Sequence, residues 1–275
     1  MKLHLAKQSG FCFGVKRAIK IAKACATKYN NVCIKGDLVH NENVCKDIES
    51  MGIKKVLHLN NLPSSSTIII KAHGEAKATH EELKNKGLRI IDATCPMVKD
   101  IHKKAAGMEK NNYQVVIIGD KNHEETKGIL GNISKGIIVE NSFEVKKIKN
   151  LLNKKIGVVC QSTQNQENVS LVLYELSKYA QEIKFINTIC QPTRLRQKEI
   201  EKLAQKCNAV LIVGSKKSAN TKRLYEVACG KNKNTFWLAS GNIDKRSFSK
   251  FKSIGIIGGA STPVEIIGRL KEKLK

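Results

Sequence analysis

Three segments of the chain repeat one pattern around a cysteine, and this repeat constrains the fold more than any other feature. They begin at three cysteines and read CFGVKRAIKIAKACATK from Cys12, CPMVKDIHKKAAGMEK from Cys95 and CQPTRLRQKEIEKLAQK from Cys190. Val or Thr follows each cysteine by three residues, and Lys or Arg by four. The remainder has the spacing of an amphipathic helix. Such self-similarity predicts a repeated architecture.

The spacing beyond each predicted helix is also the same. A short apolar segment ends in glycine 24 residues after each cysteine, at Gly36, Gly119 and Gly214. Four residues after each glycine comes a polar side chain, namely His40, His123 and Ser218. Three equal offsets predict three equivalent loops.

Further apolar segments predict more strands. One runs into each cysteine, at residues 2–6, 88–94 and 183–189. Another follows each glycine later in the chain, at residues 66–70, 155–160 and 253–258. The loops after this second group carry His73, the turn from Gln161 through Ser162 and Thr163, and Ser261.

Strands that alternate with helices of some 15 residues predict parallel α/β units, whose ligands bind beyond the carboxyl ends of the strands. We therefore expect three similar parallel α/β domains, at residues 1–94, 95–187 and 188–275. The cysteine intervals of 83 and 95 residues suggest a pseudo-threefold trefoil in which each domain sends one cysteine to the centre.

Composition argues against several classes of protein. The net charge of +25 is spread along the chain, and aromatic residues make up 5%, which argues against a base-stacking nucleic-acid platform. No apolar stretch approaches the roughly 20 residues of a membrane helix. The nine cysteines include no C-x-x-C pair, and no export signal is evident, so we expect a reducing compartment.

Three converging thiolates favour a metal centre. Soft sulfur ligands select iron–sulfur clusters, zinc or copper(I). A structural zinc takes four ligands, whereas an iron–sulfur cubane with three protein ligands keeps one iron open for substrate. The cysteines come at helix N-termini, where the helix dipole favours an anionic group.

The polar loop residues are candidates for binding an anion. Six neutral or cationic donors could hold a phosphate or diphosphate: His40, His73, His123, Ser218, Asn220 and Ser261. Ser218 and Asn220 could equally cap a helix. Glu125 follows His123 by two residues and could deliver protons. The remaining histidines, His102 among them, are expected to be ordinary surface or core residues.

These motifs together resemble the 4-hydroxy-3-methylbut-2-enyl diphosphate reductases nearly end to end. The matching motifs, in order, are GFCFGVKRAI, VHNENV, KAHGE, DATCPMV, NHEETKG, the turn at 161–163, ICQPTRLRQ, VGSKKSAN and GGASTP. The resemblance implies a trefoil around one 4Fe–4S cluster held by Cys12, Cys95 and Cys190. It also implies that the six donors contact substrate, that Glu125 relays protons, and that Ser162 or Thr163 supplies a hydroxyl.

The resemblance further implies a reaction and a partner. The substrate hydroxyl would bind the open iron, and two electrons and two protons would remove it as water, giving isopentenyl and dimethylallyl diphosphate. Ferredoxin or flavodoxin would donate the electrons, in a bacterial cytoplasm or a plastid-type organelle. One departure is Ala219, where many family members have serine, so one diphosphate hydrogen bond is expected to be missing.

Two other functions stay open from the residues alone. A basic α/β protein could bind nucleic acid, which would show a salt-sensitive affinity and no chromophore. A zinc hydrolase would hold zinc in place of iron and sulfide. A nicotinamide dehydrogenase is disfavoured because GIIGGAS lacks the G-x-G-x-x-G spacing.

Overall fold

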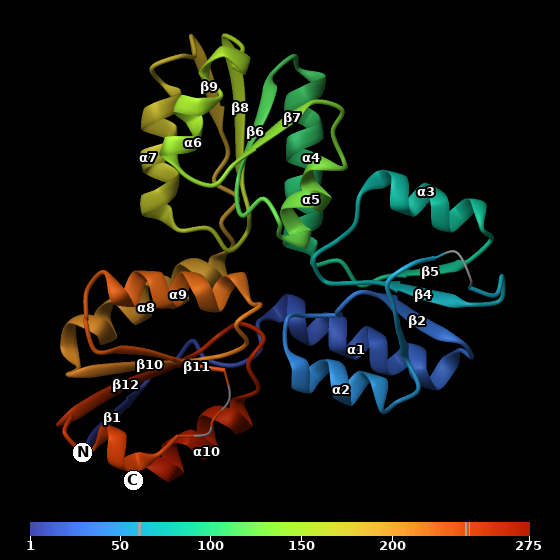
Figure 1. The fold of residues 1–275 in the computed structure, drawn as a ribbon. Coiled ribbons are helices and arrows are strands. Elements are labelled where there is room, and N and C mark those ends of the chain that lie inside the picture. The colour runs from blue at the N-terminus through green and yellow to red at the C-terminus, as the bar shows by residue number, and fades with distance from the viewer. Residues whose placement is uncertain (60–61, 240, 242) are drawn as a thin grey trace. The chain divides into compact units, whose positions relative to one another are not determined.

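The chain forms three parallel four-stranded sheets with helices around them (Figure 1). This computed structural model describes residues 1–59, 62–239, 241 and 243–275. The predicted α/β class with parallel sheets is confirmed.

The first sheet has the order β3-β2-β4-β5. Its strands are β2 (Val32–Lys35), β3 (Lys54–Val56), β4 (Thr67–Ile70) and β5 (Arg89–Asp92). The helices of this part of the chain are α1 (Phe13–Lys28), α2 (Glu42–Glu49) and α3 (Lys77–Asn85).

The second sheet has the order β7-β6-β8-β9. Its strands are β6 (Gln114–Ile118), β7 (Gly136–Val139), β8 (Lys155–Cys160) and β9 (Glu182–Phe185). The accompanying helices are α4 (Pro96–Lys110), α5 (Glu124–Leu130), α6 (Ser142–Lys147), the short η1 (Lys149–Leu151) and α7 (Gln166–Leu176).

The third sheet has the order β1-β12-β10-β11. Its strands are β1 (Lys2–Leu5), β10 (Ala209–Val213), β11 (Thr235–Leu238) and β12 (Ser253–Gly258). Its helices are α8 (Gln191–Lys206), α9 (Ala219–Cys229), the short η2 (Lys245–Phe248) and α10 (Val264–Leu274).

All three sheets follow one hydrogen-bonding plan. The glycines after β2, β6 and β10 each donate their N–H to the carbonyl of the last residue of the neighbouring edge strand, β3, β7 or β11. The pairs are Gly36 to Val56, Gly119 to Val139 and Gly214 to Leu238, at 2.9 to 3.0 Å. The equal sequence offsets of these glycines therefore reflect equal places in three sheets.

The first strand departs from the predicted domain 1–94. β1 pairs with β12, so it completes the sheet built from the end of the chain. The reason is that the strand running into each repeat cysteine is an edge strand of a sheet built from another part of the chain. β5 and β9 run into Cys95 and Cys190 and are edge strands of the first and second sheets, and β1 runs into Cys12 and is an edge strand of the third. The other two predicted boundaries fall between β5 and α4 and between β9 and α8. The three-domain division as such stays a prediction.

Both faces of the second sheet are buried, which explains its continuous apolar strands. Val115 and Ile117 of β6 pack with residues of α4 and α5, whereas the alternating Val116 and Ile118 pack with residues of α6 and α7. Since successive strand side chains point to opposite faces, the apolar residues of β6 pack against the helices on both faces of the sheet.

By their backbone contacts the described residues fall into two compact units. The terminal unit comprises residues 1–16, 40–43 and 190–275 and contains the third sheet. The central unit comprises residues 17–39 and 44–189 and contains the other two sheets. No helix within the described residues has the length and apolar character that crossing a membrane requires.

Candidate functional site

The three repeat cysteines occupy the same local position, directly before a helix. The carbonyls of Cys12, Cys95 and Cys190 accept the first helical hydrogen bonds of α1, α4 and α8, from Lys16, Lys99 and Arg194. All three side chains are half-buried, whereas Cys25, Cys33, Cys160 and Cys207 are buried in the core. Partial exposure at a helix N-terminus suits a thiolate that binds a metal.

A buried arginine lies beside two of these cysteines in the terminal unit. Arg196 is only 3% exposed and donates from Nη2 to the carbonyl of Gly10 at 2.7 Å. Burial lowers the pKa of Arg196, and the neighbouring Cys12 and Cys190 counteract this shift. Among the described residues Arg196 forms no ion pair, and its Nε has no hydrogen-bond partner. A buried cation of this kind calls for an anionic neighbour.

The terminal unit also contains four of the predicted phosphate donors. Ser218 caps α9, because its Oγ accepts the N–H of Thr221 at 3.3 Å. Asn220 is 4% exposed, and neither its amide nitrogen nor its amide oxygen has a partner among the described residues. Ser261 donates from Oγ to the carbonyl of His40 at 3.0 Å. The capping prediction for Ser218 is thus confirmed, whereas the Asn220 side chain makes no capping hydrogen bond among the described residues.

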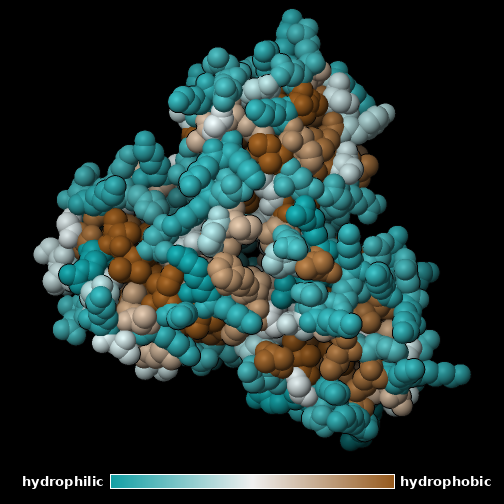
Figure 2. All heavy atoms as spheres, turned by 180° about the vertical axis from the view of Figure 1, so that it is seen from behind, coloured by the Kyte–Doolittle hydropathy of each residue, from teal (hydrophilic) through white to brown (hydrophobic). Residues whose placement is uncertain are grey.

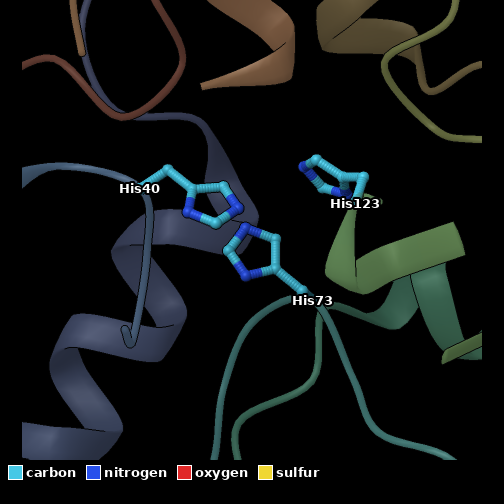
Figure 3. Close-up of side chains that lie close together, drawn as sticks. All are labelled: His40, His73 and His123. Atoms are coloured by element: carbon cyan, nitrogen blue, oxygen red, sulfur yellow. The ribbon is translucent and has the colours of Figure 1, made fainter. Parts of the chain in front are cut away.

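Two predicted histidines lie together in the central unit (Figure 3). The rings of His73, after β4, and His123, before α5, meet edge to face with centroids 5.5 Å apart. His123 accepts the Glu125 N–H at Nδ1, so its neutral form carries the proton on Nε2. Figure 3 also labels His40, which comes from the loop before α2 in the terminal unit.

Glu125 is buried and bonded to the turn after β8. Its Oε1 accepts the N–H of Ser162 at 2.5 Å, and its Oε2 accepts the Ser162 hydroxyl at 2.9 Å. Burial raises the pKa of Glu125, against the lowering effect of these hydrogen bonds. The adjacent Thr163 differs, because its hydroxyl is buried and has no partner among the described residues.

A group of charged residues next to His73 was not predicted from the sequence. Lys71, only 6% exposed, contacts Glu124 at 2.6 Å and Glu75 at 3.1 Å. The second carboxylate oxygen of Glu124 lies 3.4 Å from Nδ1 of His73. Burial alone would raise the pKa of Glu124, but the hydrogen bonds from His73 and Lys71 hold this pKa well below its usual range.

Signals for these residues were present in the sequence. Lys71 directly follows the apolar residues 68–70 of β4, where a lysine needs a partner. Arg196 falls on the stripe of α8 that also holds Thr193, Ile200 and Ala204, all buried. A charged residue at helical spacing on an apolar face indicates a buried charge.

Comparison with known proteins identifies the family. The sequence pattern of the family described as "LytB protein" matches residues 3–275. The chain belongs to the LytB family. Two LytB-family relatives are named 4-hydroxy-3-methylbut-2-enyl diphosphate reductase. That of Aquifex aeolicus is 36% identical over 98% of this chain and 95% of its own length. That of Dictyoglomus thermophilum is 39% identical over 100% and 96%.

Solved structures agree with the LytB assignment. A structure described as (E)-4-hydroxy-3-methyl-but-2-enyl diphosphate reductase, the terminal enzyme of the non-mevalonate pathway, is 36% identical, with a TM-score of 0.72 over 100% of this chain and 99% of that one. The Plasmodium falciparum reductase is 32% identical, with a TM-score of 0.94 over 98% and 87%. The resemblance inferred from the motifs is therefore confirmed.

Proposed function

We propose that the chain reduces (E)-4-hydroxy-3-methylbut-2-enyl diphosphate to isopentenyl and dimethylallyl diphosphate. Two electrons and two protons enter, the C–O bond breaks, and water leaves. The observation that carries this proposal is the identical placement of Cys12, Cys95 and Cys190 before three equivalent helices, in a chain that matches LytB reductases over its whole length.

We assign one 4Fe–4S cluster to these three cysteines. The residues fit an anionic cluster, since the half-buried thiols sit at helix N-termini and Arg196 places a buried cation, without an ion pair among the described residues, beside two of them. Such a cluster, when bound, would supply single electrons and Lewis-acid chemistry for the loss of the hydroxyl. Arg196 would stabilise the added negative charge.

We assign the diphosphate to the six polar donors that the motifs indicated. Asn220 supports this, because a buried amide without a partner costs about 1–3 kcal/mol unless a ligand satisfies it. Nδ1 of His123 accepts the Glu125 N–H, so neutral His123 carries its proton on Nε2 and can donate it to the diphosphate. The other proposed contacts are His40, His73, Ser218 and Ser261.

We assign proton delivery to Glu125. Its raised pKa keeps a proton available at higher pH than an ordinary carboxyl would, and general acids work best when their pKa lies near the working pH. Ser162 holds both oxygens of Glu125, so we give the substrate contact to the hydroxyl of Thr163 instead.

We expect a small acidic electron carrier, ferredoxin or flavodoxin, as the donor, in a bacterial cytoplasm or a plastid-type organelle. The net charge of +25 supports this choice, because opposite charge speeds encounter.

Turnover by anaerobically purified protein tests the proposal. With a chemical reductant and the hydroxylated diphosphate, we expect both isomeric products and one water per substrate consumed. Protein that contains zinc in place of iron and sulfide, or that forms neither product, would overturn it.

A further inference from the structure

Four charged side chains of the central unit form a continuous ion-pair chain that ends at His73. Lys35 lies 3.5 Å from Glu75, Glu75 lies 3.1 Å from Lys71, and Lys71 lies 2.6 Å from Glu124. The side chains of Lys71 and Glu75 are 7% and 11% exposed. Burying charges costs free energy unless they are well paired, so these ion pairs differ from ordinary charges on a solvated surface and point to a functional role.

The backbone leaves room for this chain of charges. Gly36 has a φ of +78°, and a Cβ there would lie 3.3 Å from Oε1 of Glu124 and 3.5 Å from Nζ of Lys71. A larger residue at this position would therefore be strained in its backbone and would crowd the ion pair. Gly36 thus serves both the turn after β2 and the Glu124–Lys71 contact.

The two oxygens of Glu124 have different neighbours. Lys71 holds Oε1, which leaves Oε2 directed at Nδ1 of His73, 3.4 Å away. A carboxylate at Nδ1 fixes the orientation of an imidazole ring and thereby the direction in which Nε2 points.

We propose that Glu124, anchored by Lys71, is a positioning residue that orients the ring of His73 toward the diphosphate. This inference rests on the proposed function and deepens it. The adjacent glutamates then have separate tasks. Glu124 stays ionised and orients the ring of His73, while Glu125 carries a proton toward the reacting group.

Calorimetry with inorganic diphosphate on the oxidised holoenzyme tests the proposal. We expect Glu124→Gln to weaken binding about tenfold, because the ring of His73 loses the carboxylate that orients it. Lys71→Met should also weaken binding, since it removes the contact that holds Oε1 of Glu124. In turnover, Glu124→Gln raises KM for the substrate more than it lowers kcat.

Glu81→Gln is the matched control. Glu81 pairs with Lys77 at 3.8 Å on the exposed surface of α3, with side chains 60% and 75% exposed. We expect wild-type diphosphate affinity and KM for this variant. Glu124→Asp keeps the charge and should recover part of the lost affinity.

The possible results separate this inference from the proposed function. If wild-type protein neither binds diphosphate nor reduces the substrate, both are wrong. If wild-type protein does both and Glu124→Gln matches it in affinity and KM, only the role of Glu124 is wrong. A Glu124→Gln variant whose kcat falls as much as its KM rises, with no recovery in Glu124→Asp, would also overturn it, since this indicates a purely structural ion pair.

Discussion

At the scale of single residues, two neighbouring glutamates show how position decides chemistry. Glu124 keeps its charge because Lys71 and His73 contact it, whereas burial raises the pKa of Glu125. The sequence alone indicated Glu125, since it follows the loop of a predicted strand. It could not separate the two pKa values, because these depend on partners 37 to 53 residues distant in the chain.

Replacing Glu125 by Gln should reduce turnover and raise stability. Gln keeps the shape but cannot deliver a proton, so we expect kcat to fall by about 10²- to 10⁴-fold. A carboxyl whose pKa is raised on folding loses stability as the pH rises above about 4.3 toward its folded pKa. Gln does not ionise, so the variant does not lose this stability as the pH rises.

The Tm of Glu125→Gln should accordingly exceed that of wild type at pH 7.5, and the difference should shrink toward pH 4. Turnover and thermal unfolding of the same preparation measure both effects. A variant with wild-type kcat, or with a lower Tm at pH 7.5, contradicts the assignment.

Ser162 and Thr163 should respond differently to loss of the hydroxyl. Thr163→Val removes a group without a partner in the described chain, so we expect KM to rise a few-fold with little change in kcat. Ser162→Ala removes a hydrogen bond to Glu125, so kcat should fall instead. Steady-state kinetics of the two variants side by side gives the result, and reversed effects would assign the contact to Ser162.

At the scale of elements, the repeat predicted the central strands, the helices after the cysteines and the glycine-ended loops. These succeeded because apolar periodicity and equal offsets are local signals. The edge strands β3, β7 and β11 were not predicted. They have three or four residues each and pair on one side only, so their sequences carry little periodicity. The place of β1 depends on a partner some 250 residues away.

The helix α4 contains a histidine that the sequence treated as ordinary. A Cβ on Gly74, next to His73, would meet Cε1 of His102 at 3.0 Å, and one on Gly128 would lie 3.6 Å from Nε2. His102 therefore packs between α4, the turn after β4 and α5. Burial, with a smaller effect from His80, lowers the pKa of His102 to about 4.

This lowered pKa predicts an acid-sensitive contribution to stability. The unfolded chain binds a proton near pH 6.5 and the folded chain does not, so stability is lost as the pH falls from about 6.5 toward 4. In His102→Gln this loss should be smaller by about 1–3 kcal/mol. Urea unfolding of both proteins at pH 7 and pH 5 measures it. An unchanged pH dependence would mean that His102 is protonated in the fold.

At the scale of the whole molecule, charge is the dominant surface property. Hydrophilic side chains predominate on the face drawn in Figure 2, and the hydrophobic residues there lie in separate patches. With 49 basic and 24 acidic residues, the chain should attract an acidic electron carrier.

Turnover with an acidic ferredoxin should therefore fall several-fold as salt rises from about 0.05 to 0.3 M, because the screening length is about 8 Å at 0.15 M. An uncharged chemical reductant serves as the control and should show little change. The same salt dependence with both reductants would mean that the charge does not steer the carrier.

The central claim is that Cys12, Cys95 and Cys190 hold one iron–sulfur cluster. Iron and acid-labile sulfide, measured in anaerobically reconstituted protein, test it most directly. Wild type and the control variants Cys25→Ser, Cys45→Ser and Cys229→Ser should each contain close to four of both per chain. Serine at Cys12, Cys95 or Cys190 should abolish stable incorporation while the folded content by circular dichroism is retained. Full iron and sulfide in any of those three variants would contradict the account.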